Sequence, residues 1–223
     1  MGGEDQQQTQ YSNAVSSTID TMGSGASSSS ISNTVGYHKM IAVNVGIPLV
    51  LFSIIASVYS SYVIMGYKWM WFSYHPSSMI ISYVAMAGNA ALIKKIGGYD
   101  NTKKHGMIMV VATLLASFAF YVIYSNKIKQ NKHHFTTLHG KVGLAVVLGY
   151  IGLGLFGAVG LNPDWGYFRM HKQLRAVHKF SGRFVTMLAW YCCVLGYSTM
   201  EKDIMMQGLF AVPLLGFSYF VLL

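Results

Sequence analysis

Four histidines recur at the same position relative to four successive apolar stretches of the chain: His75, His105, His139 and His178. The intervals between them are 30, 34 and 39 residues, and each interval matches one membrane crossing of about 20 apolar residues plus a loop. Ionisable side chains in apolar helices are costly, and they usually pair, line a water path or bind a ligand. The spacing therefore predicts a binding function for these histidines.

Consecutive spans run in opposite directions, so the four histidines form two pairs. His75 and His139 should lie near one face of the membrane, and His105 and His178 near the other. A helix N-terminus carries partial positive charge, which keeps a nearby imidazole neutral, as a metal ligand must be. Two imidazoles are too few for a zinc site, which uses three or four protein ligands, but they suffice for the two axial positions of a haem iron. With both positions filled no place is left for oxygen, so the pattern predicts electron transfer without a separate catalytic residue.

Histidine is amphipathic and collects at membrane interfaces, which would explain one or two of the four but not four in register. The remaining histidines lie in flanking segments, where a solvated loop position is the simpler interpretation. His134 is a candidate for substrate binding because it lies five residues before His139.

The elements that must position these residues follow from composition. The chain has 223 residues, of which 53% are hydrophobic and 10% charged, which is typical of a protein surrounded by lipid. We predict an all-α polytopic membrane protein with six transmembrane helices, and His75 as the N-cap of the second because Pro76 suits a first helical position. The apolar stretches cover about residues 40–65, 76–93, 106–124, 138–160, 178–197 and 204–223.

Residues 1–36 are rich in Ser, Gln, Thr and Gly and contain too few large apolar groups to form a core. We expect a disordered tail there, followed by a membrane domain over residues 37–223. Cys192 and Cys193 are adjacent and make neither a disulfide framework nor a zinc site, so two small buried residues are expected. Glycines of the fourth stretch, such as Gly143 and Gly157, fit either close helix packing or a seat for a flat cofactor.

The formal charge of +9 does not indicate nucleic acid binding, because the basic residues lie between apolar runs. This placement reports membrane topology, since cytoplasmic loops carry an excess of Lys and Arg. If the N-terminus is cytoplasmic, that side holds ten basic residues: Lys39, Lys94, Lys95, Lys103, Lys104, Arg169, Lys172, Arg175, Lys179 and Arg183. The opposite side holds six: Lys68, Lys127, Lys129, Lys132, Lys141 and Lys202. Both termini are therefore expected in the cytoplasm.

Four segments around the histidines resemble the cytochrome b561 family, in its short branch without an attached extracellular domain, from about Tyr37 to the end of the chain. They are Phe72-Ser73-Tyr74-His75-Pro76, Lys104-His105-Gly106, His134-Phe135-Thr136-Thr137-Leu138-His139-Gly140 and Val177-His178-Lys179-Phe180-Ser181-Gly182. The resemblance implies six helices, a haem-binding core of helices two to five, two haems b, and a homodimer. It also implies that His75 and His139 ligate the haem on the non-cytoplasmic side and that His105 and His178 ligate the cytoplasmic one.

The resemblance further implies a transmembrane reductase that takes electrons from cytosolic ascorbate and passes them to monodehydroascorbate or ferric iron. Lys103, Lys104 and Arg175, together with Lys94 and Lys95, are candidates for attracting the ascorbate anion. Arg183 lies more than one turn beyond His178, so it is a candidate partner of a haem propionate. A haem-free transporter using histidines as a proton or metal path remains an alternative, although it predicts acidic residues within the helices. A respiratory-type cytochrome b would instead need two histidines about four turns apart on one helix, and no predicted helix has such a pair.

Overall fold

The computed structural model describes residues 28–222, with side chains from Thr34 onward, and this part of the chain is helical with no strand. From His38 onward the chain forms one compact unit. The first helix begins at Ser28, so it includes the last nine residues of the tail expected to be disordered (28–36), while that expectation for residues 1–27 lies outside the described residues.

Each predicted span corresponds to one long helix or to a series of consecutive helical segments. In chain order, these are α2 Ser28–Val58 with the π-helical η1 Tyr59–Val63; η2 Trp71–Ser73, α3 Tyr74–Ile80, the π-helical η3 Ile81–Met86 and α4 Ala87–Ile96; α5 Tyr99–Lys129; α6 Leu138–Leu155 with the π-helical η4 Phe156–Gly160; α7 Lys172–Met200; and α8 Ile204–Leu222.

Five helical stretches of the described chain are long and apolar enough to cross a membrane: 34–63, 71–96, 99–129, 138–160 and 204–222. The sixth predicted span corresponds to α7, which has 29 residues but carries four basic residues in its first half: Lys172, Arg175, Lys179 and Arg183. It packs against α6 and α8. The architecture is that of an all-α polytopic membrane protein.

Three of the four histidines do not lie where the apolar stretches placed them. His75 is the second residue of α3, whose N-cap is Ser73, so the prediction that His75 is the cap was wrong. The helices α5 and α7 begin at Tyr99 and Lys172, and His105 and His178 therefore lie inside them. A hydropathy pattern detects the lipid-facing part of a helix, whereas backbone hydrogen bonds propagate further into polar sequence. The helix-terminus argument for neutral imidazoles thus applies to His75 and His139, each the second residue of its helix, and not to His105 and His178.

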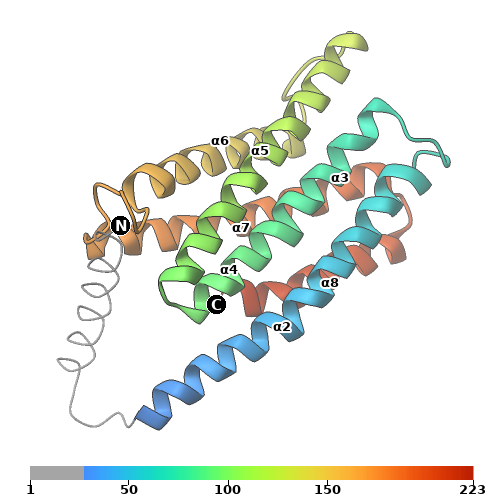
Figure 1. The fold of residues 1–223 in the computed structure, drawn as a ribbon. Coiled ribbons are helices and arrows are strands. Elements are labelled where there is room, and N and C mark those ends of the chain that lie inside the picture. The colour runs from blue at the N-terminus through green and yellow to red at the C-terminus, as the bar shows by residue number, and fades with distance from the viewer. Residues whose placement is uncertain (1–27, 223) are drawn as a thin grey trace. The chain divides into compact units, whose positions relative to one another are not determined.

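Large apolar side chains cover the outside of the helices, and alanines and serines make up much of the buried interior. Leu114 and Leu148 are 65% and 60% exposed, as expected for side chains that face lipid. The segments α3 and α4 lie between α2 and α5, with α7 behind them (Figure 1). This arrangement brings α3, α4, α5, α6 and α7 around the four histidines.

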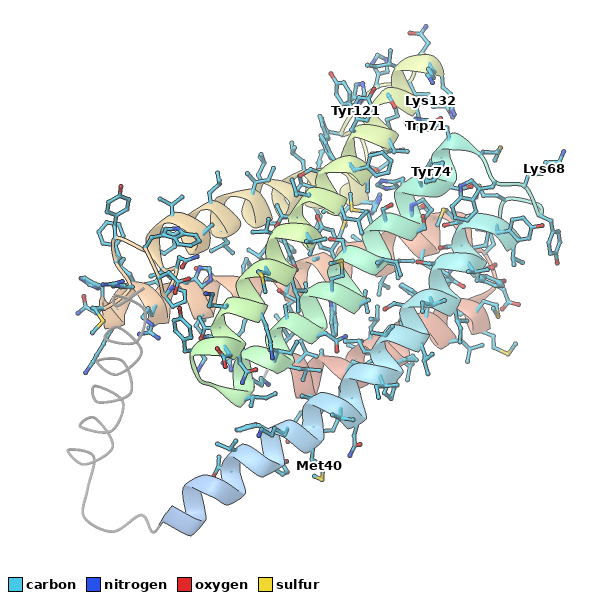
Figure 2. All side chains as sticks on the ribbon, in the orientation of Figure 1. Met40, Lys68, Trp71, Tyr74, Tyr121 and Lys132 are labelled. Atoms are coloured by element: carbon cyan, nitrogen blue, oxygen red, sulfur yellow. The ribbon has the colours of Figure 1, made fainter. Side chains whose placement is uncertain are left out.

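One end of the bundle is rich in aromatic and lysine side chains. Figure 2 shows Trp71, Tyr74 and Tyr121 at the same end as Lys68 and Lys132. The Trp71 indole N–H donates to Ser125 Oγ at 2.9 Å. Aromatic rings with one polar edge are typical of the level of the lipid headgroups, so this end is expected to lie at a membrane surface.

Candidate functional site

The rings of His75 on α3 and His139 on α6 lie next to each other. Their ring centroids are 6.2 Å apart, with an angle of 75° between the ring planes. An iron with one imidazole nitrogen about 2 Å away on each side would hold two ring centroids about 6 Å apart. The observed separation therefore fits one metal ion held axially between the two rings.

Backbone carbonyls select the tautomer of three of the four histidines. His75 Nδ1 lies 3.0 Å from the carbonyl oxygen of Ala119, and His105 Nδ1 lies 2.9 Å from that of Ala90. His139 Nδ1 lies 3.1 Å from the carbonyl oxygen of Cys192. A carbonyl only accepts, so Nδ1 carries the proton and the lone pair of Nε2 is free to ligate a metal. This is the orientation that hydrogen bonds usually impose on metal-binding histidines.

His178 is held differently. Its Nδ1 is buried and has no hydrogen-bond partner among the described residues. The ring lies against η4 at Gly157, where an added Cβ would lie 3.2 Å from Cε1. His105 is within electrostatic range of the ring. The ring is therefore positioned by packing in a place that Gly157 leaves open.

A second glycine makes room for His139. A Cβ added at Gly196 on α7 would lie 2.7 Å from His139 Cε1 and 3.3 Å from Nε2. Both glycines thus allow an imidazole to approach a neighbouring backbone. At Gly157 the structure shows the close approach of a histidine ring to the backbone.

The contacts of the four rings define two levels along the bundle, the His75–His139 level and the His105–His178 level. Three of the histidines contact a neighbouring helix at a point 14 or 15 residues away from the histidine of the other pair that this helix carries. Ala90 lies 15 residues after His75 on the α3–α4 stretch. Ala119 lies 14 residues after His105 on α5, and Cys192 lies 14 residues after His178 on α7. At about 1.5 Å per residue, the two levels are roughly 21 Å apart.

The donor set of each level favours a haem over a metal ion held by protein alone. Within the described residues there is no group of three or more His, Cys, Asp or Glu side chains that could hold a metal ion. Two converging imidazoles are the donor set of a six-coordinate haem. His75, His139, His105 and His178 would hold two such groups, one at each level.

Two buried tyrosines lie between the levels. Tyr83 and Tyr150 are each 3% exposed, and their ring centroids are 4.7 Å apart. The Tyr150 hydroxyl contacts Thr186 Oγ1 at 3.2 Å, and the carbonyl oxygen of Tyr83 accepts from the Trp190 indole N–H at 2.8 Å. Sequence analysis did not single out these residues, because an aromatic side chain in an apolar run looks the same in a core as beside a cofactor.

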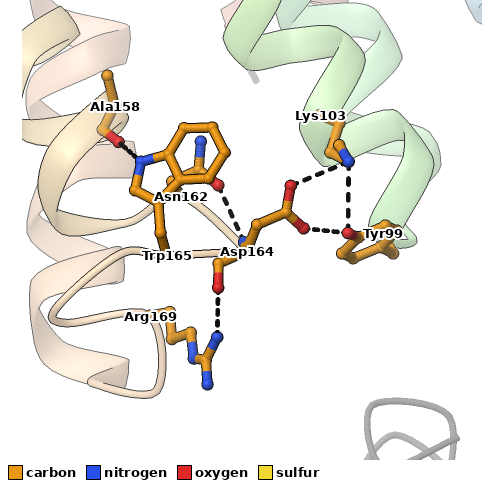
Figure 3. Close-up of polar contacts among 7 residues, drawn as sticks. All are labelled: Tyr99, Lys103, Ala158, Asn162, Asp164, Trp165 and Arg169. Carbon is orange, nitrogen blue, oxygen red and sulfur yellow. Dashed lines mark hydrogen bonds and ion pairs between the residues drawn. The ribbon is translucent and has the colours of Figure 1, made fainter. Parts of the chain in front are cut away.

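A polar cluster fastens the loop after η4 to the first turns of α5 (Figure 3). The Asp164 carboxylate pairs with Lys103 Nζ at 2.9 Å and accepts from the Tyr99 hydroxyl. Arg169 donates to the Asp164 carbonyl oxygen at 2.6 Å, and Arg175 donates to the Arg169 carbonyl oxygen at 3.3 Å. The hydroxyl of Tyr99 and then the ammonium of Lys103 hold the pKa of Asp164 below its usual value.

The predicted substrate residues divide between the two ends of the bundle. Lys103 and Arg175 both contact the loop at the His105–His178 end, and Lys104 is exposed beside them. Lys103 is engaged by Asp164, a partner that the sequence did not suggest because it lies far along the chain. Arg183 is half-buried on α7 within electrostatic range of Lys95.

His134 lies at the other end, between α5 and α6. Its ring stacks on Tyr124 with centroids 4.2 Å apart. It lines a hollow of about 260 Å³ together with Lys127, Ile128, Asn131, Lys132 and His133. The hollow is therefore bordered by two ammonium groups and two imidazoles.

The sequence of the chain matches one protein family. A family model described as eukaryotic cytochrome b561 matches residues 74–203, which include all four histidines. A transmembrane ascorbate-dependent reductase of Ovis aries is 23% identical over 169 residues, or 68% of this chain. An ascorbate-specific transmembrane electron transporter of Zea mays is 26% identical over 140 residues, or 59% of this chain. The matches span 66% and 56% of the lengths of these two relatives.

Proposed function

Because the chain belongs to the eukaryotic cytochrome b561 family, we propose that it is a transmembrane oxidoreductase that takes electrons from ascorbate. The four histidines would hold two b-type haems between the donor and an acceptor on the opposite side, either monodehydroascorbate or ferric iron. The observation that supports this most is the arrangement of four histidines at two levels, three of them with Nε2 left free by a carbonyl bond to Nδ1. The ascorbate-dependent relatives support ascorbate as the donor.

The chain's own residues would bind and orient the haems and exclude water from the interior of the bundle. His75 with His139, and His105 with His178, would each hold one haem iron through two imidazoles, which would leave no position for oxygen. When bound, the haems supply reversible one-electron storage. The apolar helix walls keep water from the interior, and Arg183, more than one turn inside α7, is proposed to pair with a propionate.

Donor and acceptor are proposed to bind at opposite ends of the bundle. At the His105–His178 end, Lys103, Lys104 and Arg175 present positive charge to an ascorbate anion, and such charge raises the local concentration of an anion. At the His75–His139 end, His134 and the lysines around it border the hollow in which an acceptor would bind. The family's homodimeric state is proposed for this chain as well.

Single substitutions of the histidines test the proposal. We expect His75→Ala and His139→Ala to remove one and the same haem, and His105→Ala and His178→Ala to remove the other, because each pair shares one iron. Haem content and reduced-minus-oxidised spectra of the purified variants measure this. Purified, folded wild-type protein without haem absorbance would refute the proposal and favour a haem-free transporter. Equal loss of both haems in all four folded variants would refute the pairing.

A further inference from the structure

Cys192 contacts His139 through both its backbone carbonyl and its thiol, whereas His75 and His105 are each contacted by a carbonyl oxygen alone. Its carbonyl oxygen accepts from His139 Nδ1 at 3.1 Å, and its Sγ lies 3.4 Å from the same nitrogen. The thiol also lies 3.6 Å from the carbonyl oxygen of His139, within the range of a weak S–H donor bond. One residue on α7 therefore contacts both the ring and the backbone of His139 on α6.

The other histidines have no comparable thiol. His75 and His105 each meet a single carbonyl oxygen, from Ala119 and Ala90. Cys192 is only 6% exposed, and a Cβ at Gly143 would lie 3.5 Å from its Sγ. The thiol is thus confined beside the ring of His139.

We propose that Cys192 is a positioning residue, which orients the His139 ring and lowers the midpoint potential of the haem at the His75–His139 level. The S–H of Cys192 donates to the carbonyl oxygen of His139, which leaves a sulfur lone pair facing His139 Nδ1. The proton on Nδ1 is already donated to the carbonyl oxygen of Cys192, so the sulfur is a second acceptor for it. A second acceptor draws that proton further from the ring and makes Nε2 a better electron donor. A stronger donor favours the oxidised iron over the reduced one, as hydrogen bonds to metal-bound histidines are known to do.

The inference rests on the proposed function, because it requires a haem on His139. No bond is made or broken, and the thiol remains reduced. The neighbouring Cys193 supplies a matched control, since it has the same chemistry and is half-buried in the same turn of α7. Among the described residues, the hydrogen bonds to His139 come from Cys192 and none comes from the Cys193 thiol.

The test is a spectroelectrochemical titration of the purified protein with four variants: Cys192→Ala, Cys192→Val, Cys192→Ser and Cys193→Ala. We expect Cys192→Ala to raise the midpoint potential of one haem and to change its electron paramagnetic resonance signal, with the other haem unchanged. Cys192→Val should do the same, because it fills similar space without a hydrogen-bonding atom. Cys192→Ser should return the potential toward that of the wild type, and Cys193→Ala should change neither haem.

The affected haem is assigned by repeating the titration in a His178→Ala background. Unchanged potentials and signals in both Cys192→Ala and Cys192→Val, with full haem content, would overturn the inference. So would a shift of equal size in Cys193→Ala. Failure of the proposed function would appear separately, as wild-type protein that binds no haem. If Cys192→Ala does not retain haem, the comparison of Cys192→Val and Cys192→Ser with the wild type decides the question.

Discussion

At the scale of single residues, the two tyrosines between the histidine levels differ in what their hydroxyls meet. The Tyr150 hydroxyl has Thr186 as a partner, whereas the Tyr83 hydroxyl is buried without a hydrogen-bond partner in the described chain. An unsatisfied buried polar group costs about 1–3 kcal/mol, whereas a satisfied hydrogen bond contributes about 1 kcal/mol. The two rings are in contact, so they provide a matched comparison.

We predict that Tyr83→Phe raises the free energy of unfolding by about 1 kcal/mol and that Tyr150→Phe lowers it by about the same amount. The first substitution removes an unpartnered hydroxyl, and the second leaves Thr186 Oγ1 without its partner. Thermal unfolding of the two variants in the same detergent measures the difference. Equal destabilisation by both would show that the Tyr83 hydroxyl has a partner in the membrane, such as an internal water.

At the scale of helices, the approach of α7 to α6 depends on a residue without a side chain. We predict that Gly196→Ala displaces the His139 ring, because the new Cβ would lie 2.7 Å from Cε1. The variant should lose the haem at the His75–His139 level while keeping the other, as measured by haem content and difference spectra.

Gly208→Ala on α8 is the control, since a Cβ there meets nothing within 4 Å. This variant should keep both haems and gain about 0.5–1 kcal/mol of stability, because alanine loses less conformational freedom than glycine. Full haem content in Gly196→Ala would contradict the packing argument.

The mobility of the loop between η4 and α7 is expected to depend on pH through Asp164. The pKa of Asp164 is lower in the folded protein than in the unfolded chain. The carboxylate therefore stabilises the folded loop fully at pH values above its pKa in the unfolded chain, and this stabilisation is lost as the pH falls through its pKa in the folded protein. We predict that a spin label at the exposed Tyr167 becomes more mobile as the pH falls into this range. In Asp164→Asn, the label should be mobile already at neutral pH.

Asp100→Asn is the control for this loop. Asp100 is an exposed carboxylate in the first turn of α5, one residue from Tyr99, and its replacement leaves the Asp164 pair in place. The label in Asp100→Asn should follow the pH dependence of the wild type. Unchanged label mobility in Asp164→Asn would show that the loop is held by the backbone contacts of Arg169 and Arg175 instead.

Sequence patterns predicted the helices better than the ends of the helices, and they did not predict the contacts around the four histidines. The predicted span 138–160 matches α6 and η4, because the N-cap Thr137 lies directly before an apolar run. The starts of α5 and α7 were placed too late, because their first turns are polar. The contact of Cys192 with His139 joins residues 53 positions apart. Such contacts depend on how helices pack, which local composition does not encode.

At the scale of the whole molecule, the distribution of basic residues predicts the membrane topology. We predict that the N-terminus, the loop before α5 and the loop before α7 share the cytoplasmic side, because ten basic residues lie on that side and six on the other. Membrane-impermeant maleimides can test this with single cysteines in a Cys192→Ser, Cys193→Ser background. Labelling of the segment from Lys127 to Lys132 by reagent on the cytoplasmic side would reverse the orientation.

The 14- and 15-residue spacing between the histidine levels also determines how the protein would respond to voltage. A separation of roughly 21 Å is about two thirds of a hydrocarbon core of about 30 Å. A full crossing by one charge corresponds to about 2.3 kcal/mol per 100 mV, so passage between the levels corresponds to about 1.5 kcal/mol. That is roughly a tenfold change in the equilibrium for every 100 mV. A cytoplasm that is electrically negative would push electrons from the His105–His178 level outward, so the membrane potential itself would help drive the reduction of the acceptor.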